Sequence, residues 1–135
     1  MTQIYIGAGS NQNGEYHLKC AYLDLKHVFD EVVMSPIYIS DAYGSEVGKK
    51  YHNCVFSAST TLDVDACIAL LKQIENENGR QRPARLYGVS LDLDLLLFGY
   101  LVDKARRIPR EDIYKYDFVS QPLKDIAPDL ILPRP

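Results

Sequence analysis

The segment "LDLDLLLF", residues 91–98, constrains the fold more than any other stretch of the chain. Its alternation predicts an extended strand, because successive side chains of a strand point to opposite faces of a sheet. Asp92 and Asp94 then share one face. The leucines expected on the other face are Leu91, Leu93, Leu95 and Leu97. At a rise of about 3.3 Å per residue, the two aspartate Cα atoms lie roughly 6.6 Å apart, so their carboxylates can hold one divalent cation or a pair of them.

Composition narrows the class of protein. A chain of 135 residues with 47% hydrophobic residues predicts a single globular domain spanning residues 1–135. The longest apolar run is too short for a membrane span, and "MTQIYIGAGS" lacks the pattern of a signal peptide. We therefore expect a cytoplasmic protein without a membrane partner. Cys20, Cys54 and Cys67 are odd in number and have no CxxC spacing, which predicts buried free thiols.

Basic residues gather in two clusters although the net charge is −3. The first comprises Arg80, Arg82 and Arg85, and the second comprises Lys104, Arg106, Arg107 and Arg110. The acidic balance argues against nucleic acid as a partner but permits a local basic site. Guanidinium groups beside paired aspartates suit a metal-bridged polyphosphate, since each guanidinium can bind two oxygens at once. A solvated arginine loop beside a solvent-facing acid pair is the ordinary alternative.

Periodicity and turn residues predict the secondary structure. The expected strands cover residues 4–10, with a turn at Gly7 and Gly9, and residues 31–40, 53–60, 91–98 and, returning after a hairpin, 100–103. The expected helices cover residues 15–29, capped by Asn13, a segment from Asp63 or Asp65 to Gly79, and a short one at 117–124. The order β, α, β, β, α, β predicts an α+β, ferredoxin-like fold. We expect a mainly antiparallel sheet with helices on one side, followed by a C-terminal hairpin and tail.

Four segments in order resemble one family. The segments are "YIGAGSN", "YHN" at residues 51–53, "GRQRPARLYGVSLDLDLLLFG" and "DFVSQPLKDIAPDL". They resemble the 6-hydroxymethyl-7,8-dihydropterin pyrophosphokinase family of folate biosynthesis, over nearly the whole chain. The resemblance implies a ferredoxin-like fold and an enzyme that moves pyrophosphate from ATP to the hydroxymethyl oxygen of the pterin, releasing AMP. Its partners are then two small-molecule substrates.

The same resemblance implies how the pterin is bound. The ring is expected between Tyr51 and Phe118. Asn53 is expected to hydrogen-bond to the edge of the ring, and backbone groups around Tyr43 and Gly44 to complete the recognition. This assignment agrees with elementary chemistry. A flat heterocycle gains from stacking on aromatic rings, and an amide supplies both a donor and an acceptor.

For the nucleotide, the resemblance implies that Asp92 and Asp94 hold two Mg²⁺ ions that bridge the phosphates of ATP. Arg80 and Arg82 match catalytic arginines on the phosphate side. Further nucleotide-binding residues are expected at Glu75, Tyr87 and Arg110.

The sequence departs from the family on the phosphate side. The segment "YGVSLDLD" lacks the arginine that the family places before the first aspartate, and Arg110, Glu111 and Tyr116 stand where the family has histidine, tyrosine and arginine. Arg110 can still supply positive charge, whereas Glu111 repels a polyphosphate unless it turns away. Other cations that could replace the lost contacts are Arg85, Arg106 and Arg107.

Two alternatives to the transfer reaction stay open. One is a pterin-binding protein of the same fold with weak or no transfer activity. The other is a ferredoxin-like nucleic-acid module whose aromatic residues stack on bases, against which the acidic balance and the paired aspartates count.

Overall fold

A computed structural model describes residues 1–41 and 50–134. The elements, in chain order, are β1 (Thr2–Ser10), α1 (Gly14–Val28), β2 (Asp30–Met34), β3 (Tyr38–Asp41), β4 (Lys50–Thr60), α2 (Val64–Glu77), α3 (Ala84–Tyr87), β5 (Asp92–Phe98), α4 (Asp112–Lys115) and α5 (Asp117–Ile126). Tyr43, Gly44 and the side chain of Arg85 lie outside this description.

The strands form an antiparallel sheet of order β2-β4-β1-β5, in which β3 also pairs with β4. If β2 and β3 are taken as two parts of one edge, this order is that of the ferredoxin-like fold, and the predicted fold class is confirmed. The strand expected over 31–40 is divided at Ser35 and Pro36 because proline has no N–H for a ladder hydrogen bond. Ser35 keeps this part of the edge attached to β4: its N–H donates to the Val55 carbonyl and its Oγ accepts from the Val55 N–H, both at 2.9 Å.

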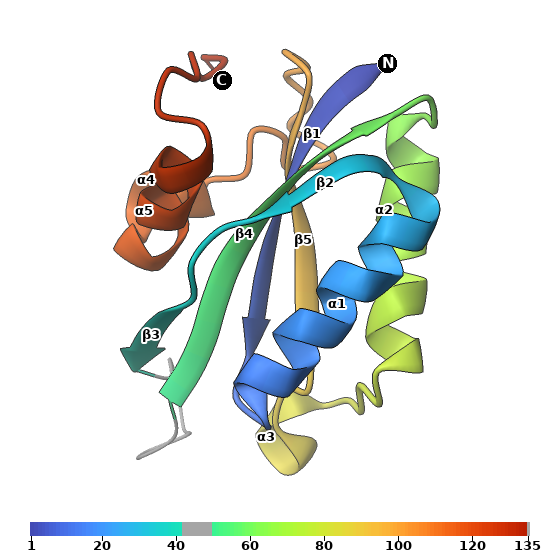
Figure 1. The fold of residues 1–135 in the computed structure, drawn as a ribbon, viewed down its shortest axis with the longest axis vertical. Helices are drawn as coiled ribbons and strands as arrows, with labels where there is room; N and C mark the ends of the chain where they lie inside the picture. Colours follow the sequence, from blue (N-terminus) through green and yellow to red (C-terminus); the bar gives the residue numbers. More distant parts are fainter. Residues whose placement is uncertain (42–49, 135) are drawn as a thin grey trace.

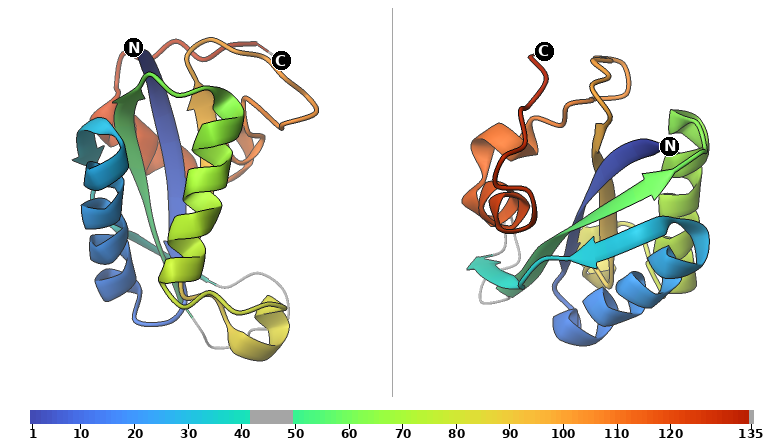
Figure 2. Two further views of the ribbon diagram at one scale, coloured as in Figure 1. Left: turned by 90° about the vertical axis from the view of Figure 1, so that its right-hand side faces the viewer. Right: turned by 45° about the horizontal axis from the view of Figure 1, so that its top comes forward.

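Helices α1 and α2 lie side by side over one face of the sheet (Figures 1 and 2). Their apolar stripes, which include Leu18 and Leu25 of α1 and Leu71 of α2, form the larger hydrophobic cluster with Leu93 and Leu95 of β5. This arrangement is the predicted one. The opposite face carries α4 and α5, whereas the sequence predicted helices on one side only (Figure 1).

Strand β5 confirms the shared face of the two aspartates and corrects one leucine. The pairing with β1 shifts register between Leu95 and Leu97, so Leu96 is an extra residue in a bulge. A bulge interrupts the alternation of faces. Leu97 therefore joins Leu96 in the cluster under α5, instead of lying with Leu93 and Leu95 as predicted.

The predicted residues at the helix ends are confirmed for α2 and in part for α1. Asp63 caps α2, since its side chain accepts a hydrogen bond from the Ala66 N–H at 2.8 Å. Gly79 adopts a left-handed conformation beyond the end of α2, with φ +79°, as expected. Asn13 precedes α1, but its side chain makes no capping hydrogen bond.

The hairpin prediction is wrong in detail. Residues 100–103 form no strand in the described part of the chain, and Asp103 makes only an isolated bridge to Ile108. Gly7 and Gly9, expected to make a turn, lie inside β1.

All three cysteines are free, and Cys54 and Cys67 are buried as expected, while Cys20 is partly exposed. Among the described residues, no helix has the length and apolar character that crossing a membrane requires.

Candidate active site

The face of the sheet under α5 contains a cavity of about 220 Å³. It lies where three neighbouring strands meet: Gly9 of β1 pairs with Asn53 of β4 on one side and with Asp92 of β5 on the other. Two interstrand spacings, about 10 Å, therefore separate the backbone of Asn53 from that of Asp92. A flat ring with a short arm can span that distance, with its edge at Asn53 and its arm toward Asp92.

Two glycines provide the floor of this first cavity. Gly7 and Gly9 both line it, and a methyl group added to Gly9 would stand 3.4 Å from the Asn53 Oδ1 and 3.6 Å from the Tyr51 Cδ1. At Gly7 an added methyl group would stand 3.1 Å from the Leu96 Cδ2, closer than ordinary van der Waals contact. The glycines therefore keep the strand surface flat, which leaves room for a ring to lie across it.

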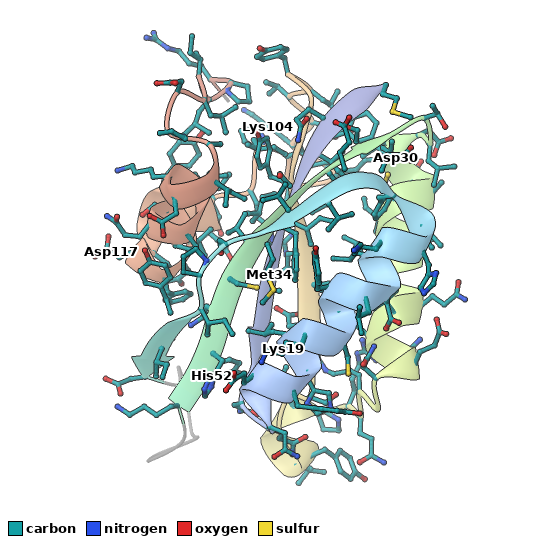
Figure 3. The ribbon with its side chains drawn as sticks, in the orientation of Figure 1. Lys19, Asp30, Met34, His52, Lys104 and Asp117 are labelled. Carbon is teal, nitrogen blue, oxygen red and sulfur yellow. The ribbon has the colours of Figure 1, made fainter. Side chains whose placement is uncertain are left out.

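Asn53 has a fixed orientation in this cavity. Its Nδ2 donates to the Ser40 Oγ at 2.9 Å and to the Tyr38 carbonyl at 3.2 Å, and the residue is 7% exposed. With the nitrogen held by β3, the oxygen lies beside Gly9 on the cavity floor. Tyr51 and Phe118 line the same cavity. In Figure 3, His52 marks the part of β4 that carries Tyr51 and Asn53, and Asp117 marks the start of α5.

A second cavity, of about 280 Å³, lies along the outer edge of β5 beside α2. Asp92 and Asp94 line this cavity as well as the first. Its charged lining is otherwise mostly cationic and comes from Lys72, Arg80, Arg82, Arg106 and Arg110, with Glu75 as the further acid. The two aspartates thus lie between an aromatic cavity and a cationic one.

Glu75 organises the cationic cavity. It is 5% exposed and accepts hydrogen bonds from the Leu93 N–H at 2.7 Å and from the Arg82 Nη2 at 2.8 Å. Burial raises the pKa of the Glu75 carboxyl, which the hydrogen bond from Leu93 and the charges of the two arginines oppose. The Arg80 Nη1 lies 4.0 Å from Glu75, 3.5 Å from the Asp92 Oδ1 and 3.0 Å from the Leu91 carbonyl, to which it donates.

Asp94 has a different cationic partner. Its Oδ1 lies 3.3 Å from the Arg110 Nη2, and the Arg110 N–H donates to the Leu96 carbonyl at 3.0 Å. Burial, followed by the charge of Asp92, raises the pKa of the Asp94 carboxyl to about 7, and the charge of Arg110 opposes that rise. The ionised form of Asp94 is therefore disfavoured, and an additional cation beside the pair would favour it. The Nε groups of Arg80 and Arg110 are buried and have no acceptor among the described residues.

The family model for 7,8-dihydro-6-hydroxymethylpterin-pyrophosphokinase (HPPK) matches residues 5–128. The chain belongs to this family. It is 38% identical to the 2-amino-4-hydroxy-6-hydroxymethyldihydropteridine pyrophosphokinase of Pseudomonas aeruginosa, with 97% of this chain and 84% of the relative covered.

The chain is 35% identical to the pyrophosphokinase of the same name from Haemophilus influenzae, with 98% of this chain and 86% of the relative covered. It is 31% identical to the one from Aquifex aeolicus, with 98% of this chain and 85% of the relative covered. The family and the enzyme class predicted from the sequence, an ATP-dependent pyrophosphokinase of folate biosynthesis, are thereby confirmed.

Most of the residues predicted for an HPPK site come together around the two cavities. Those lining the first cavity are Tyr51, Asn53, Phe118, Asp92 and Asp94, and those lining the second are Glu75, Arg80, Arg82, Arg110 and the same two aspartates. Tyr87 is 47% exposed and is not among the described residues that line either cavity. Tyr43 and Gly44 lie outside the described residues.

Arg106 and Arg107 of the second basic cluster have acidic partners on the surface. Arg106 lines the second cavity, yet its guanidinium is held by Asp65 at 2.8 Å and Asp103 at 2.7 Å. Glu111, predicted to repel a polyphosphate unless it turned away, pairs with Arg107 and Lys115, both at 3.3 Å. These exposed pairs neutralise Glu111 on the surface of α4.

Sequence reasoning missed several residues of the first cavity. Asp41 and Asp112 line it, as do the two glycines of its floor. The alternation of β1 could have placed Gly7 and Gly9 on one face, because they are two residues apart in a strand. No local pattern marks Asp41 or Asp112, which reach the cavity only through the packing of β3 and α4.

Proposed function

We propose that this chain transfers pyrophosphate from ATP to 6-hydroxymethyl-7,8-dihydropterin, with the pterin in the first cavity and the phosphates of ATP in the second. The observation that carries the proposal is that Asp92 and Asp94 line both cavities. In the reaction, the hydroxymethyl oxygen loses its proton and bonds to the β-phosphorus. The bond from that phosphorus to the oxygen bridging the α-phosphorus breaks, and AMP leaves with the bridging oxygen.

On the pterin side, Tyr51 and Phe118 provide aromatic faces and Asn53 recognises the ring edge. The amide nitrogen of Asn53 is held by β3, so its oxygen serves as an acceptor for the N–H groups of a pterin. Tyr43 and Gly44 are proposed to complete the recognition through their backbone. The flat floor at Gly9 supports this assignment, because a ring lying across β1 needs a strand without side chains there.

On the phosphate side, Arg80, Arg82 and Arg110 bind and orient the polyphosphate, and Glu75 and Tyr87 contribute to the nucleotide site. The unpartnered Nε groups of Arg80 and Arg110 support this role, since buried donors without acceptors are costly and phosphate oxygens would satisfy them. The three arginines are paired with Asp92, Glu75 and Asp94. Phosphate binding therefore exchanges carboxylate partners for phosphate oxygens.

The residues present fit Mg²⁺. The donor set is two carboxylates, and no group of three or more potential metal ligands occurs in the described ranges 1–41 and 50–134. Mg²⁺ is usually held by one or two carboxylates together with substrate phosphates. We propose that Asp92 and Asp94 hold two Mg²⁺ ions with ATP. When bound, these ions would neutralise the charge that develops on the transferred group.

The test is AMP formation from ATP and 6-hydroxymethyl-7,8-dihydropterin, measured by chromatography with and without Mg²⁺. We expect Mg²⁺-dependent AMP that Asp92→Ala abolishes, while Asp129→Ala, at an exposed position in the C-terminal tail, leaves it unchanged. A pterin that raises the melting temperature without AMP formation would favour the pterin-binding alternative. If neither ligand raises the melting temperature, both assignments are wrong.

A further inference from the structure

The rings of Tyr116 and Phe118 are stacked, with their centroids 4.9 Å apart and their planes 9° from parallel. Residues two apart do not face each other in a helix. Here they can, because Tyr116 is extended, with φ −123° and ψ 125°, at the junction between α4 and α5. The break between the two short helices is thus what brings the rings together.

The backbone of Tyr116 is fixed on both sides of this junction. Its N–H donates to the Asp112 carbonyl at 3.1 Å, and its own carbonyl accepts from the N–H groups of Val119 and Ser120, both at 3.0 Å. A residue held by three backbone hydrogen bonds presents its side chain from a constant position. Phe118, in the first turn of α5, packs against that side chain.

Phe118 separates the first cavity from a groove on the other side. It lines both the cavity and the groove, whose volume is about 370 Å³. Tyr116 lines the groove and, within the described residues, is not among those lining the cavity. The ring of Tyr116 therefore packs on Phe118 from the groove side, while Phe118 contributes to the wall of the cavity.

We infer that Tyr116 is a positioning residue, which holds the Phe118 ring in the orientation that stacks on the flat ring of the substrate. This inference rests on the proposed function, because the substrate ring is the pterin assigned to the first cavity. An aromatic side chain that is already held in its binding orientation loses less rotamer freedom when the ligand arrives. Tyr116 thus strengthens pterin binding without touching the pterin.

A double-mutant cycle tests this role, with 6-hydroxymethylpterin titrated into each variant by calorimetry. We expect Tyr116→Ala to weaken binding about three- to tenfold, in line with the usual strength of an aromatic pair. Because Tyr116 acts through Phe118, the Tyr116→Ala change should weaken pterin binding by less than about twofold when Phe118 is already alanine. Tyr116→Phe should bind as the unaltered chain does, since the ring and not the hydroxyl carries the effect.

Tyr114→Ala is the matched control, because that tyrosine is 52% exposed on α4 and donates its hydroxyl to the Pro133 carbonyl, away from the cavity. Tyr116→Leu provides a second variant that keeps apolar bulk if the alanine variant unfolds. Three results would each overturn the inference alone. They are unchanged pterin affinity in Tyr116→Leu, additive losses of affinity in the double-mutant cycle, and a loss of affinity in Tyr116→Phe. If the unaltered chain does not bind the pterin, the proposed function is wrong and the inference falls with it.

Discussion

Replacing Asp94 by asparagine should stabilise the metal-free protein at alkaline pH. Burial and Asp92 raise the pKa of the Asp94 carboxyl from 3.8 to about 7 in the folded chain. An acid whose pKa is raised by folding destabilises the folded state once it ionises, so stability is lost as the pH rises from about 4 through about 7. Asparagine has nearly the shape of the protonated acid but cannot ionise, and it therefore avoids this loss.

The size of the effect follows from the shift. Each pKa unit corresponds to about 1.4 kcal/mol, so a shift of about three units sets an upper limit of about 4 kcal/mol at pH 8. The Asp94 side chain is 28% exposed, and water that reaches it reduces the penalty. The loss of attraction to Arg110 is already contained in the net shift. We expect a gain of about 2 to 4 kcal/mol in the free energy of unfolding at pH 8, falling toward zero near pH 4.

Urea denaturation in a buffer containing EDTA measures this, at several pH values between 4 and 8. The control is Asp129→Asn, an exposed position where the same change of charge should alter stability by less than about 0.5 kcal/mol at every pH. A lower stability of Asp94→Asn at pH 8 would show that the carboxylate supports the fold, and a difference that does not depend on pH would show that ionisation of Asp94 carries no penalty. In either case Asp92 and Asp94 would have no repulsion for a bound cation to relieve.

Three further changes test other parts of the site and fold. Gly9→Val should weaken pterin binding tenfold or more while ATP affinity is kept, because branched methyl groups would fill the flat floor; calorimetry with each ligand would show it. Arg110→Met should raise the affinity for Mg²⁺ alone and lower the affinity for ATP, each by about tenfold, since it removes a cation 3.3 Å from Asp94. The same change at Arg107 should do neither, and equal effects at both positions would refute a specific role. Asp63→Ala should lower the free energy of unfolding by about 1 kcal/mol through loss of the helix cap, and an unchanged urea midpoint would contradict that.

Local patterns in the sequence predicted the parts of the fold that depend on local physics. The alternation around Asp92 and Asp94 correctly placed both carboxylates on one face, and one of the two predicted cap positions, Asp63, is the cap of α2. The bulge at Leu96 was not predictable in this way, because it exists only in the pairing of β5 with β1. The same limit explains the hairpin, since the residues after Phe98 have strand-like composition but no partner strand in the described sheet.

In the candidate site, too, the sequence indicated which residues are involved but not the contacts between them. The pattern of residue types and the family resemblance indicated Asn53, Glu75 and Arg110, which line the cavities. The sequence did not indicate which carboxylate each arginine contacts. That pairing depends on how α2 and the segment before α4 pack against β5, and local sequence patterns do not determine this packing.

The outer edge of β5 has a consequence for how these variants behave in solution. An unpaired strand edge can recruit a strand from another molecule and start aggregation. Here the backbone groups of Leu91, Leu93 and Leu96 are occupied by Arg80, Glu75 and the backbone of Arg110, respectively. The residues proposed to bind phosphate therefore also occupy backbone groups that could otherwise pair with another molecule. Substitutions of Arg80 or Glu75 should therefore lower solubility as well as activity, and their specific activity should be measured on the fraction that size-exclusion chromatography separates from aggregates.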